Sequence, residues 1–157
     1  MAEYKPLVLI AGRVTQLSSS DTLDAKVKET EGITLQNEEL AAAISLGMAT
    51  YISSGGKCKR AQADAAGTCK VIGLCAAAAG IAAGDSGLIQ SGGQLVSADW
   101  TSVVGATTLA PNATYFLSNS APGQLVTSAP TTGYVVEVGT AISATTMQIA
   151  IKSPIQL

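Results

Sequence analysis

The chain has 157 residues, a net charge of −2, only 13% charged residues and no histidine. Its 47% hydrophobic content is enough for a buried core in one domain, or in two small halves that share a core. The acidic balance argues against a nucleic-acid partner, and the lack of histidine removes the usual general base near neutral pH and the commonest metal ligand.

The N-terminal part, residues 1–36, is predicted to be an extended arm followed by a connector. Leu7-Val8-Leu9-Ile10 has strand propensity, and Gly12 marks a turn or bulge. Asp21 and Asp24 are three residues apart, but their flanks lack the ligand spacing of a calcium loop. We therefore expect these two carboxylates in a helix cap or a polar turn.

The segment after the connector contains the best helix candidate. Asn37 can cap a helix, Glu38 and Glu39 suit its positive end, and Leu40–Ile44 continues it for about two turns. Gly47 is a suitable stop for this short helix.

A duplication covers about residues 48–91 and 112–153, where Ala49-Thr50-Tyr51-Ile52 recurs as Ala113-Thr114-Tyr115-Phe116. Both copies have the same order of predicted strands and turns. In the first copy the strands are Ala49–Ile52, Lys57–Ala61, Lys70–Leu74 and Gly87–Ile89, and in the second they are Ala113–Phe116, Gln124–Thr127, Val135–Gly139 and Met147–Ile151. The sequence thus predicts an all-β fold, in which a duplicated β-meander within residues 37–157 forms a small sandwich or barrel, with one short helix.

Two further features concern the packing of the second half. Thr145–Lys152 alternates apolar and polar residues, and Tyr134–Ala141 is predicted to be its hairpin partner. Trp100, the single tryptophan, is expected to be a core or subunit-interface plug, although it can also anchor a partner.

Three clustered cysteines, Cys58, Cys69 and Cys75, do not have the spacing of a zinc site. Cys58 and Cys69 can face each other if they lie on neighbouring strands. The alternative, which we favour, is three small, free thiols that are buried or half-buried. No metal ligands and no cofactor are predicted.

A local basic patch is formed by Lys57, Lys59, Arg60 and Lys70, with Asp64 close by. It is either a site for an acidic partner protein or a solvated hairpin edge whose lysines prevent edge-to-edge aggregation. Ser54 and Lys57 are three residues apart, but Gly55 and Gly56 between them mark a hairpin turn rather than a catalytic helix. No catalytic residues are therefore assigned, and the chain is predicted not to be an enzyme.

Several short motifs resemble those of tailed-bacteriophage virion proteins, in particular capsid decoration (cement) and head-fibre proteins. At the N-terminus these are Tyr4–Ile10 with Gly12 and Asp21–Asp24. In the first copy they are Gly47–Tyr51, Ile72–Leu74 and Gly84–Gly87. Towards the C-terminus they are Tyr115–Ser118, Pro122–Leu125, Val138–Ser143 and Pro154–Leu157.

The resemblance implies a non-enzymatic virion protein, commonly trimeric, on the outer capsid surface. We expect it to be made in the host cytoplasm and to stabilise the capsid by bridging major capsid protein subunits, without membrane or nucleic-acid partners. A strand-forming arm suits this function because it can add to an edge of a neighbour's sheet. The alternatives are a tail-fibre or head-fibre component and a receptor- or carbohydrate-binding module.

Overall fold

The computed structural model describes residues 7–10, 13–16 and 32–157. The chain forms two units, Met1–Thr30 and Glu31–Leu157. In the first unit, β1 (Leu7–Ile10) pairs antiparallel with β2 (Arg13–Gln16), which confirms the predicted strand. The predicted turn at Gly12 and the carboxylates of Asp21 and Asp24 lie outside the described residues.

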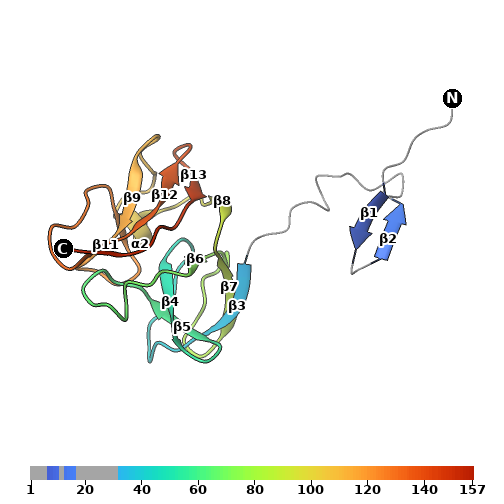
Figure 1. The fold of residues 1–157 in the computed structure, drawn as a ribbon, viewed down its shortest axis with the longest axis horizontal. Helices are drawn as coiled ribbons and strands as arrows, with labels where there is room; N and C mark the ends of the chain where they lie inside the picture. The colour runs from blue at the N-terminus through green and yellow to red at the C-terminus, as the bar shows by residue number, and fades with distance from the viewer. Residues whose placement is uncertain (1–6, 11–12, 17–31) are drawn as a thin grey trace. The chain divides into compact units, whose positions relative to one another are not determined.

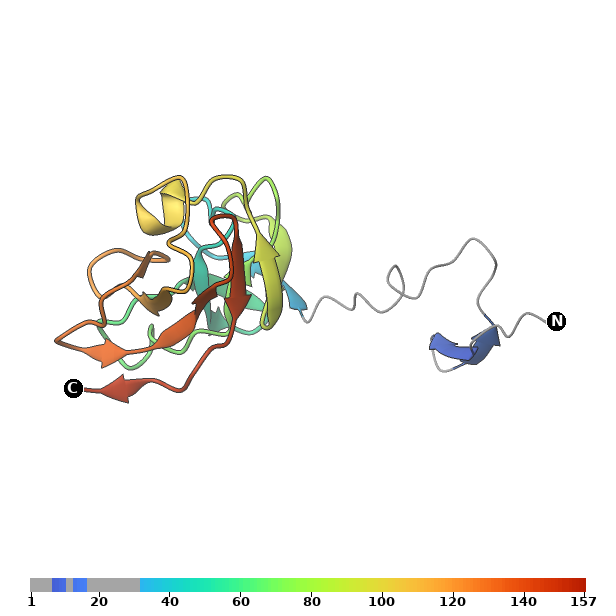
Figure 2. The ribbon, with the colours of Figure 1, turned by 90° about the horizontal axis from the view of Figure 1, so that it is seen from above.

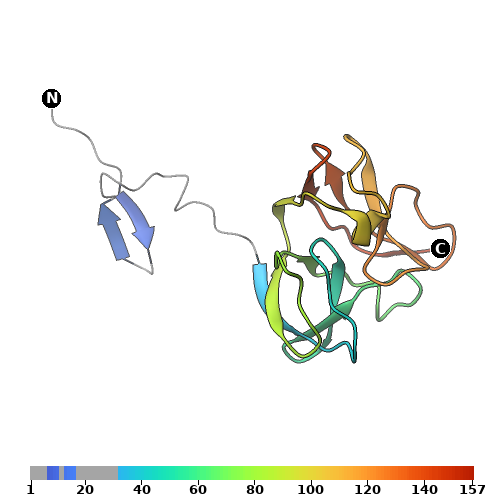
Figure 3. The same ribbon diagram turned by 180° about the vertical axis from the view of Figure 1, so that it is seen from behind.

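The first half of the second unit is a closed barrel (Figures 1 and 3). Its strands are β3 (Gly32–Asn37), β4 (Ala49–Ser54), β5 (Lys57–Arg60), β6 (Gly73–Cys75) and β7 (Ser86–Gln90). Around the barrel the order is β3-β5-β4-β6-β7. All neighbours are antiparallel except the closing pair of β3 and β5, in which Gln36 lies opposite Lys57 and Asn37 opposite Cys58.

The second half is an open sheet in the order β10-β9-β12-β13-β8. Its strands are β8 (Gly93–Val96), β9 (Thr114–Leu117), β10 (Leu125–Val126), β12 (Glu137–Ala141) and β13 (Thr146–Ile149). The short helix α2 (Thr101–Val104) follows β8. β11 (Tyr134–Val135) pairs separately with β14 (Ile155–Gln156), and Figure 2 shows the two side by side.

The strand order confirms the duplication. The first half has the neighbours β5-β4-β6-β7-β3 and the second has β10-β9-β12-β13-β8, so each strand has a counterpart in the other half. The repeat also begins earlier than the sequence indicated, because β3 and β8 are counterparts upstream of the predicted copies. The body accordingly starts at Glu31 rather than at residue 37, and β3 is part of the barrel rather than of a connector.

The two copies of Ala-Thr-Tyr do not occupy equivalent places. The turns before β4 and β9 each contain a residue with positive φ, Gly47 at 85° and Asn112 at 65°. Both donate their backbone N–H across the sheet, Gly47 to the carbonyl of Cys75 and Asn112 to that of Ala141. With Gly47 aligned on Asn112, the two motifs are one residue out of register.

This offset places Thr50 of the barrel where the open sheet has Tyr115. Thr50 lies opposite Gly73 and Tyr115 opposite Gly139, and both side chains are buried. The interior of a small closed barrel is filled by few atoms, whereas an open sheet accepts a larger ring. The sequence match therefore aligned identical residues instead of equivalent ones.

The predicted helix at residues 37–44 is wrong. β3 ends at Asn37, whose Oδ1 accepts the backbone N–H of Glu39 and whose Nδ2 donates to the carbonyls of Ala42 and Ile81, at 2.9 Å each. Ile44 and Ile81 then exchange two backbone hydrogen bonds of 2.9 Å. The Asn37 side chain does accept a backbone N–H two residues on, but this bond forms a turn and not a helix cap, because the backbone groups that follow pair with a distant segment instead of with each other.

One continuous core joins the two halves. Its largest side chain is Trp100, which is fully buried and donates its indole N–H to the carbonyl of Thr145 at 3.2 Å, as expected for a core plug. Backbone hydrogen bonds also cross between the halves, from Ala49 to Gly123 and from Gly123 to Ala61. The predicted hairpin is confirmed for β12 and β13, whereas Tyr134 and Val135, at the start of the predicted strand, pair with β14 instead.

Candidate functional site

The second repeat lacks the closure that completes the first. In the barrel, the backbone N–H of Gln36 donates to Gly56 at 3.2 Å and that of Glu38 to Cys58 at 2.9 Å, so the segment of β3 runs along β5. β10 is the counterpart of β5, and among the described strands its only partner is β9. The free edge of β10 therefore lies where a fifth pairing would close a second barrel.

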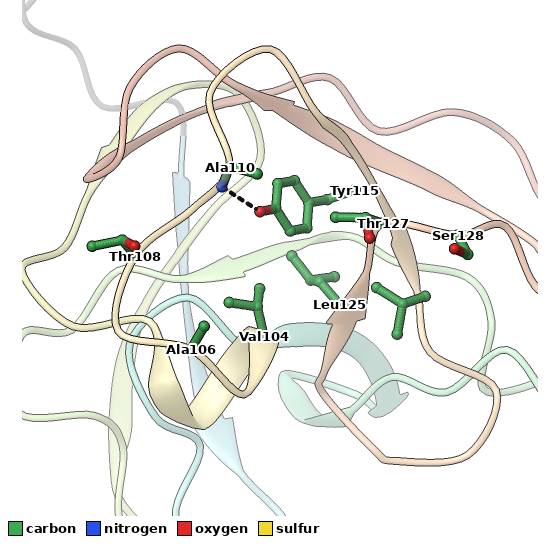
Figure 4. A pocket seen from close by; sticks show the side chains of 9 residues that line it. Val104, Ala106, Thr108, Ala110, Tyr115, Leu125, Thr127 and Ser128 are labelled. Carbon is green, nitrogen blue, oxygen red and sulfur yellow. Dashed lines mark hydrogen bonds between the residues drawn. The ribbon is translucent and has the colours of Figure 1, made fainter.

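A groove of about 440 Å³ lies between β10 and the segment formed by α2 and the loop after it (Figure 4). Tyr115 lies between the two walls, and its hydroxyl accepts the backbone N–H of Ala110 at 2.9 Å. Tyr115 and Leu125 are buried, whereas Thr108, Thr127 and Ser128 are exposed. The lining is completed by Val104, Ala106, Ala110 and Val126. The groove thus has an apolar floor and hydroxyl groups at its rim.

The free edge of β10 presents backbone hydrogen-bonding groups. Ser118 donates its N–H to the carbonyl of Gln124 at 2.9 Å, and the register continues with Leu125 opposite Leu117 and Val126 opposite Phe116. In an antiparallel pair, alternate residues bond to the partner and the others point away from it. It follows that the N–H and carbonyl groups of Leu125 and Thr127 face away from β9.

The lining of the groove suits binding of the backbone of an extended peptide rather than of a small polar ligand. None of its nine lining residues is Asp, Glu, Lys, Arg or Cys, so it offers no acid, base or charged anchor for a small polar ligand. A sheet edge next to an apolar floor is the arrangement that binds an extended peptide by strand addition. We take this groove as the candidate site.

The predicted basic patch does not form a cluster of unpaired cations. Lys57 Nζ lies 3.5 Å from Glu38 Oε1, and Arg60 Nε lies 3.2 Å from Glu39 Oε1. Glu39 also accepts the backbone N–H of Arg60 at 3.0 Å, so it fastens the segment after β3 to β5. The two glutamates that were assigned to a helix thus help to close the barrel.

Asp64 and Lys70 lie outside these ion pairs. The carboxylate of Asp64 accepts the hydroxyl of Thr68 at 2.8 Å within its own turn, and the side chains of Asp64 and Lys70 are exposed.

The three cysteines are free and buried, as the favoured interpretation predicted. Cys69 follows a turn and is not on a strand, so it does not face Cys58 across a strand pair. Desolvation, with a smaller contribution from the nearby Cys75 thiol, raises the pKa of Cys58 to about 11. Burial also raises the pKa of Cys75, whose thiol donates to the carbonyl of Ile44 at 3.4 Å. Thiols of this kind are poor nucleophiles.

The described residues offer neither a metal site nor a membrane-spanning helix. They contain no group of three or more His, Cys, Asp or Glu side chains placed to hold a metal ion. Within the same ranges, no helix is long and apolar enough to cross a bilayer.

No protein-family model, curated protein or solved structure matches this chain. The candidate site therefore rests on its own geometry. Sequence reasoning missed the groove because its two walls, residues 104–110 and 125–128, become neighbours only through the sheet order. The sequence carried no signal for the groove, because the strand predicted at Gln124–Thr127 does not indicate which strands it pairs with.

Proposed function

We propose that this chain is a structural virion protein that decorates the outer surface of a tailed-bacteriophage capsid and stabilises it by bridging major capsid protein subunits. The observation that carries the proposal is the open second sheet, whose end strands β8 and β10 each have a single partner among the described strands. An open edge on a rigid β-body is a means of joining another chain through backbone hydrogen bonds. The virion-like sequence motifs supply the identity of that chain, and a homotrimer suits a site between capsid subunits.

Surface chemistry supports an assembly role. Leu40 is 100% exposed, Val96 62% and Ile52 51%, so large apolar side chains remain available for contact with another protein. Burial of such groups against another protein removes apolar surface from water and so stabilises the complex.

The carbohydrate-binding alternative is less well supported. Such modules stack sugars on exposed aromatic rings, but Trp100 and Tyr115 are buried, and the other aromatic side chains of residues 32–157 are half-buried. Trp100 and Tyr115 belong to the core, and Tyr51 and Tyr134 pack against it.

The direct test uses DNA-expanded heads of the phage that encodes the chain, prepared from a mutant that lacks it. Added protein should bind these heads to saturation and raise their melting temperature, whereas unexpanded heads serve as the comparison. If expanded heads bind none of the protein, the decoration proposal is wrong. Density located by cryo-EM on a tail or a head fibre would favour the fibre alternative, and binding to a glycan array would favour the recognition module.

A further inference from the structure

We propose that the groove beside β10 receives the strand Leu7–Ile10 of a second copy of this chain, which adds to the edge of β10 as a parallel strand. This inference concerns self-assembly and holds whether or not the assembled protein decorates a capsid.

The acceptor is defined by comparison within the molecule. In the first repeat, β5 has antiparallel β4 on one side and parallel β3 on the other. In the second repeat, β10 has antiparallel β9 on one side and the groove on the other. The strand beside β5 is parallel, and its counterpart β8 lies at the other end of the second sheet, so the place beside β10 is open to a short parallel strand from another chain.

The chemistry of the groove selects β1 as the donor. β1 consists of Leu, Val, Leu and Ile, whereas β2 begins with Arg13. Since the nine lining residues carry no charge, an arginine side chain in the groove would be desolvated without a partner. Aliphatic side chains, in contrast, can cover the buried Leu125 and Tyr115, and the outward N–H and carbonyl groups of Leu125 and Thr127 can pair with backbone.

Binding to β10 would also stabilise the donor strand. β1 and β2 form a sheet of two strands, and a two-stranded hairpin alone is at best marginally stable in water. Addition to β10 extends this sheet and buries its aliphatic strand.

The symmetry of the contact determines the kind of oligomer. The strand of one copy meets a different surface of the next copy, so the contact is heterologous. Heterologous contacts close into a ring when the rotation permits, and a three-membered ring is the homotrimer that we propose for the virion.

The test is a cross-linking experiment on full-length chains. A tagged chain with Leu9→Cys is mixed with an untagged chain with Thr127→Cys under mild oxidation, and Val8→Cys replaces Leu9→Cys in a second set to cover the alternate register. We expect a disulfide-linked pair of one tagged and one untagged chain. Ile142→Cys, at an exposed turn between β12 and β13, is the matched control acceptor. The native cysteines are buried in both chains and should contribute little.

Two outcomes would overturn the inference. In the first, Thr127→Cys cross-links no more than Ile142→Cys. In the second, a chain that carries both Leu9→Cys and Thr127→Cys cross-links only within itself at every concentration, which would place the strand in its own groove.

A second variant tests the backbone edge directly. Thr127→Pro removes an outward N–H without touching the pairing with β9, and Thr127→Val keeps that N–H. Loss of one backbone hydrogen bond between the donor strand and β10 should raise the dissociation constant of self-association about tenfold, as measured by sedimentation. Thr127→Val should associate like the wild type, and unchanged Trp100 fluorescence would show that both variants fold. Equal self-association of folded Thr127→Pro and the wild type contradicts the proposal.

Discussion

Gly47 lies directly against the indole ring of Trp100, so that a Cβ atom on Gly47 would come within 2.7 Å of the ring carbon Cζ3. The same added Cβ atom would also lie 3.1 Å from Val103 Cγ2. Gly47 belongs to the turn before β4 of the first repeat, whereas Trp100 and Val103 belong to the second. The close approach therefore holds the two repeats in one core.

Gly47→Ala should lower the free energy of unfolding by about 2–4 kcal/mol, because it combines a positive φ with a clash in a packed core. Gly105→Ala is the control for backbone strain alone, since Gly105 has a φ of 74° and no atom within 4 Å of the added Cβ. That change should cost about 1 kcal/mol. Urea unfolding followed by Trp100 fluorescence measures both. Equal losses in the two variants would show that the contact with Trp100 is unimportant.

Glu39→Ala should destabilise the barrel by about 1–2 kcal/mol, because one carboxylate oxygen accepts both the backbone N–H and the guanidinium of Arg60. Glu38→Ala removes the more exposed pair with Lys57 and should cost less than Glu39→Ala, because solvent screens that pair. Urea unfolding at low and high salt distinguishes the two, with salt affecting mainly the Glu38 pair. A larger loss for Glu38→Ala would be inconsistent with Glu39 as the closing residue.

The stability of the protein should fall as the pH rises from 9 to 11. The pKa of the Cys58 thiol is about 11 in the fold against an ordinary value of 9.0, so in this range the unfolded chain ionises while the folded chain stays protonated. Below pH 9 both states are protonated and the effect disappears. Cys58→Ala should show a smaller decline between these pH values, measured by urea unfolding at each. Identical declines would mean that Cys58 does not contribute to this pH dependence.

The decoration proposal predicts a role for the lysines of the β4–β5 hairpin. Lys57→Ala combined with Lys59→Ala should weaken binding to expanded heads if the basic residues of this hairpin contact an acidic capsid surface, which is one of the two roles that the sequence allows for them. Arg60 is left in place because its pair with Glu39 supports the fold. Affinity is measured by co-sedimentation with heads at two salt concentrations. Unchanged affinity would count against a contact role for this hairpin.

Local sequence patterns predicted those parts of the fold that depend on local physics. The hairpin of β12 and β13 follows from the alternation of Met147 and Ile149 with polar residues, which fixes one buried face. The turn at Gly55 and Gly56 likewise follows from residues that favour a tight connection.

The parts of the fold that local patterns did not predict depend on long-range strand pairing. Ile44 forms an antiparallel β-bridge with Ile81 and is not part of a helix. No property of residues 37–44 alone indicates that partner. The groove depends on β10 having a single partner among the described strands, which only the sheet order reveals. The offset between Thr50 and Tyr115 arises because a closed barrel and an open sheet accept side chains of different size.

Each repeat begins and ends at adjacent points. Gly32 lies opposite Gln90 across β3 and β7, and Gly93 lies opposite Ile149 across β8 and β13. A unit whose ends meet can be copied in tandem through a linker of two residues, here Ser91 and Gly92, without rethreading either copy. The same geometry makes circular permutation feasible in principle, and it explains how a gene duplication could yield one cooperative body from two short segments.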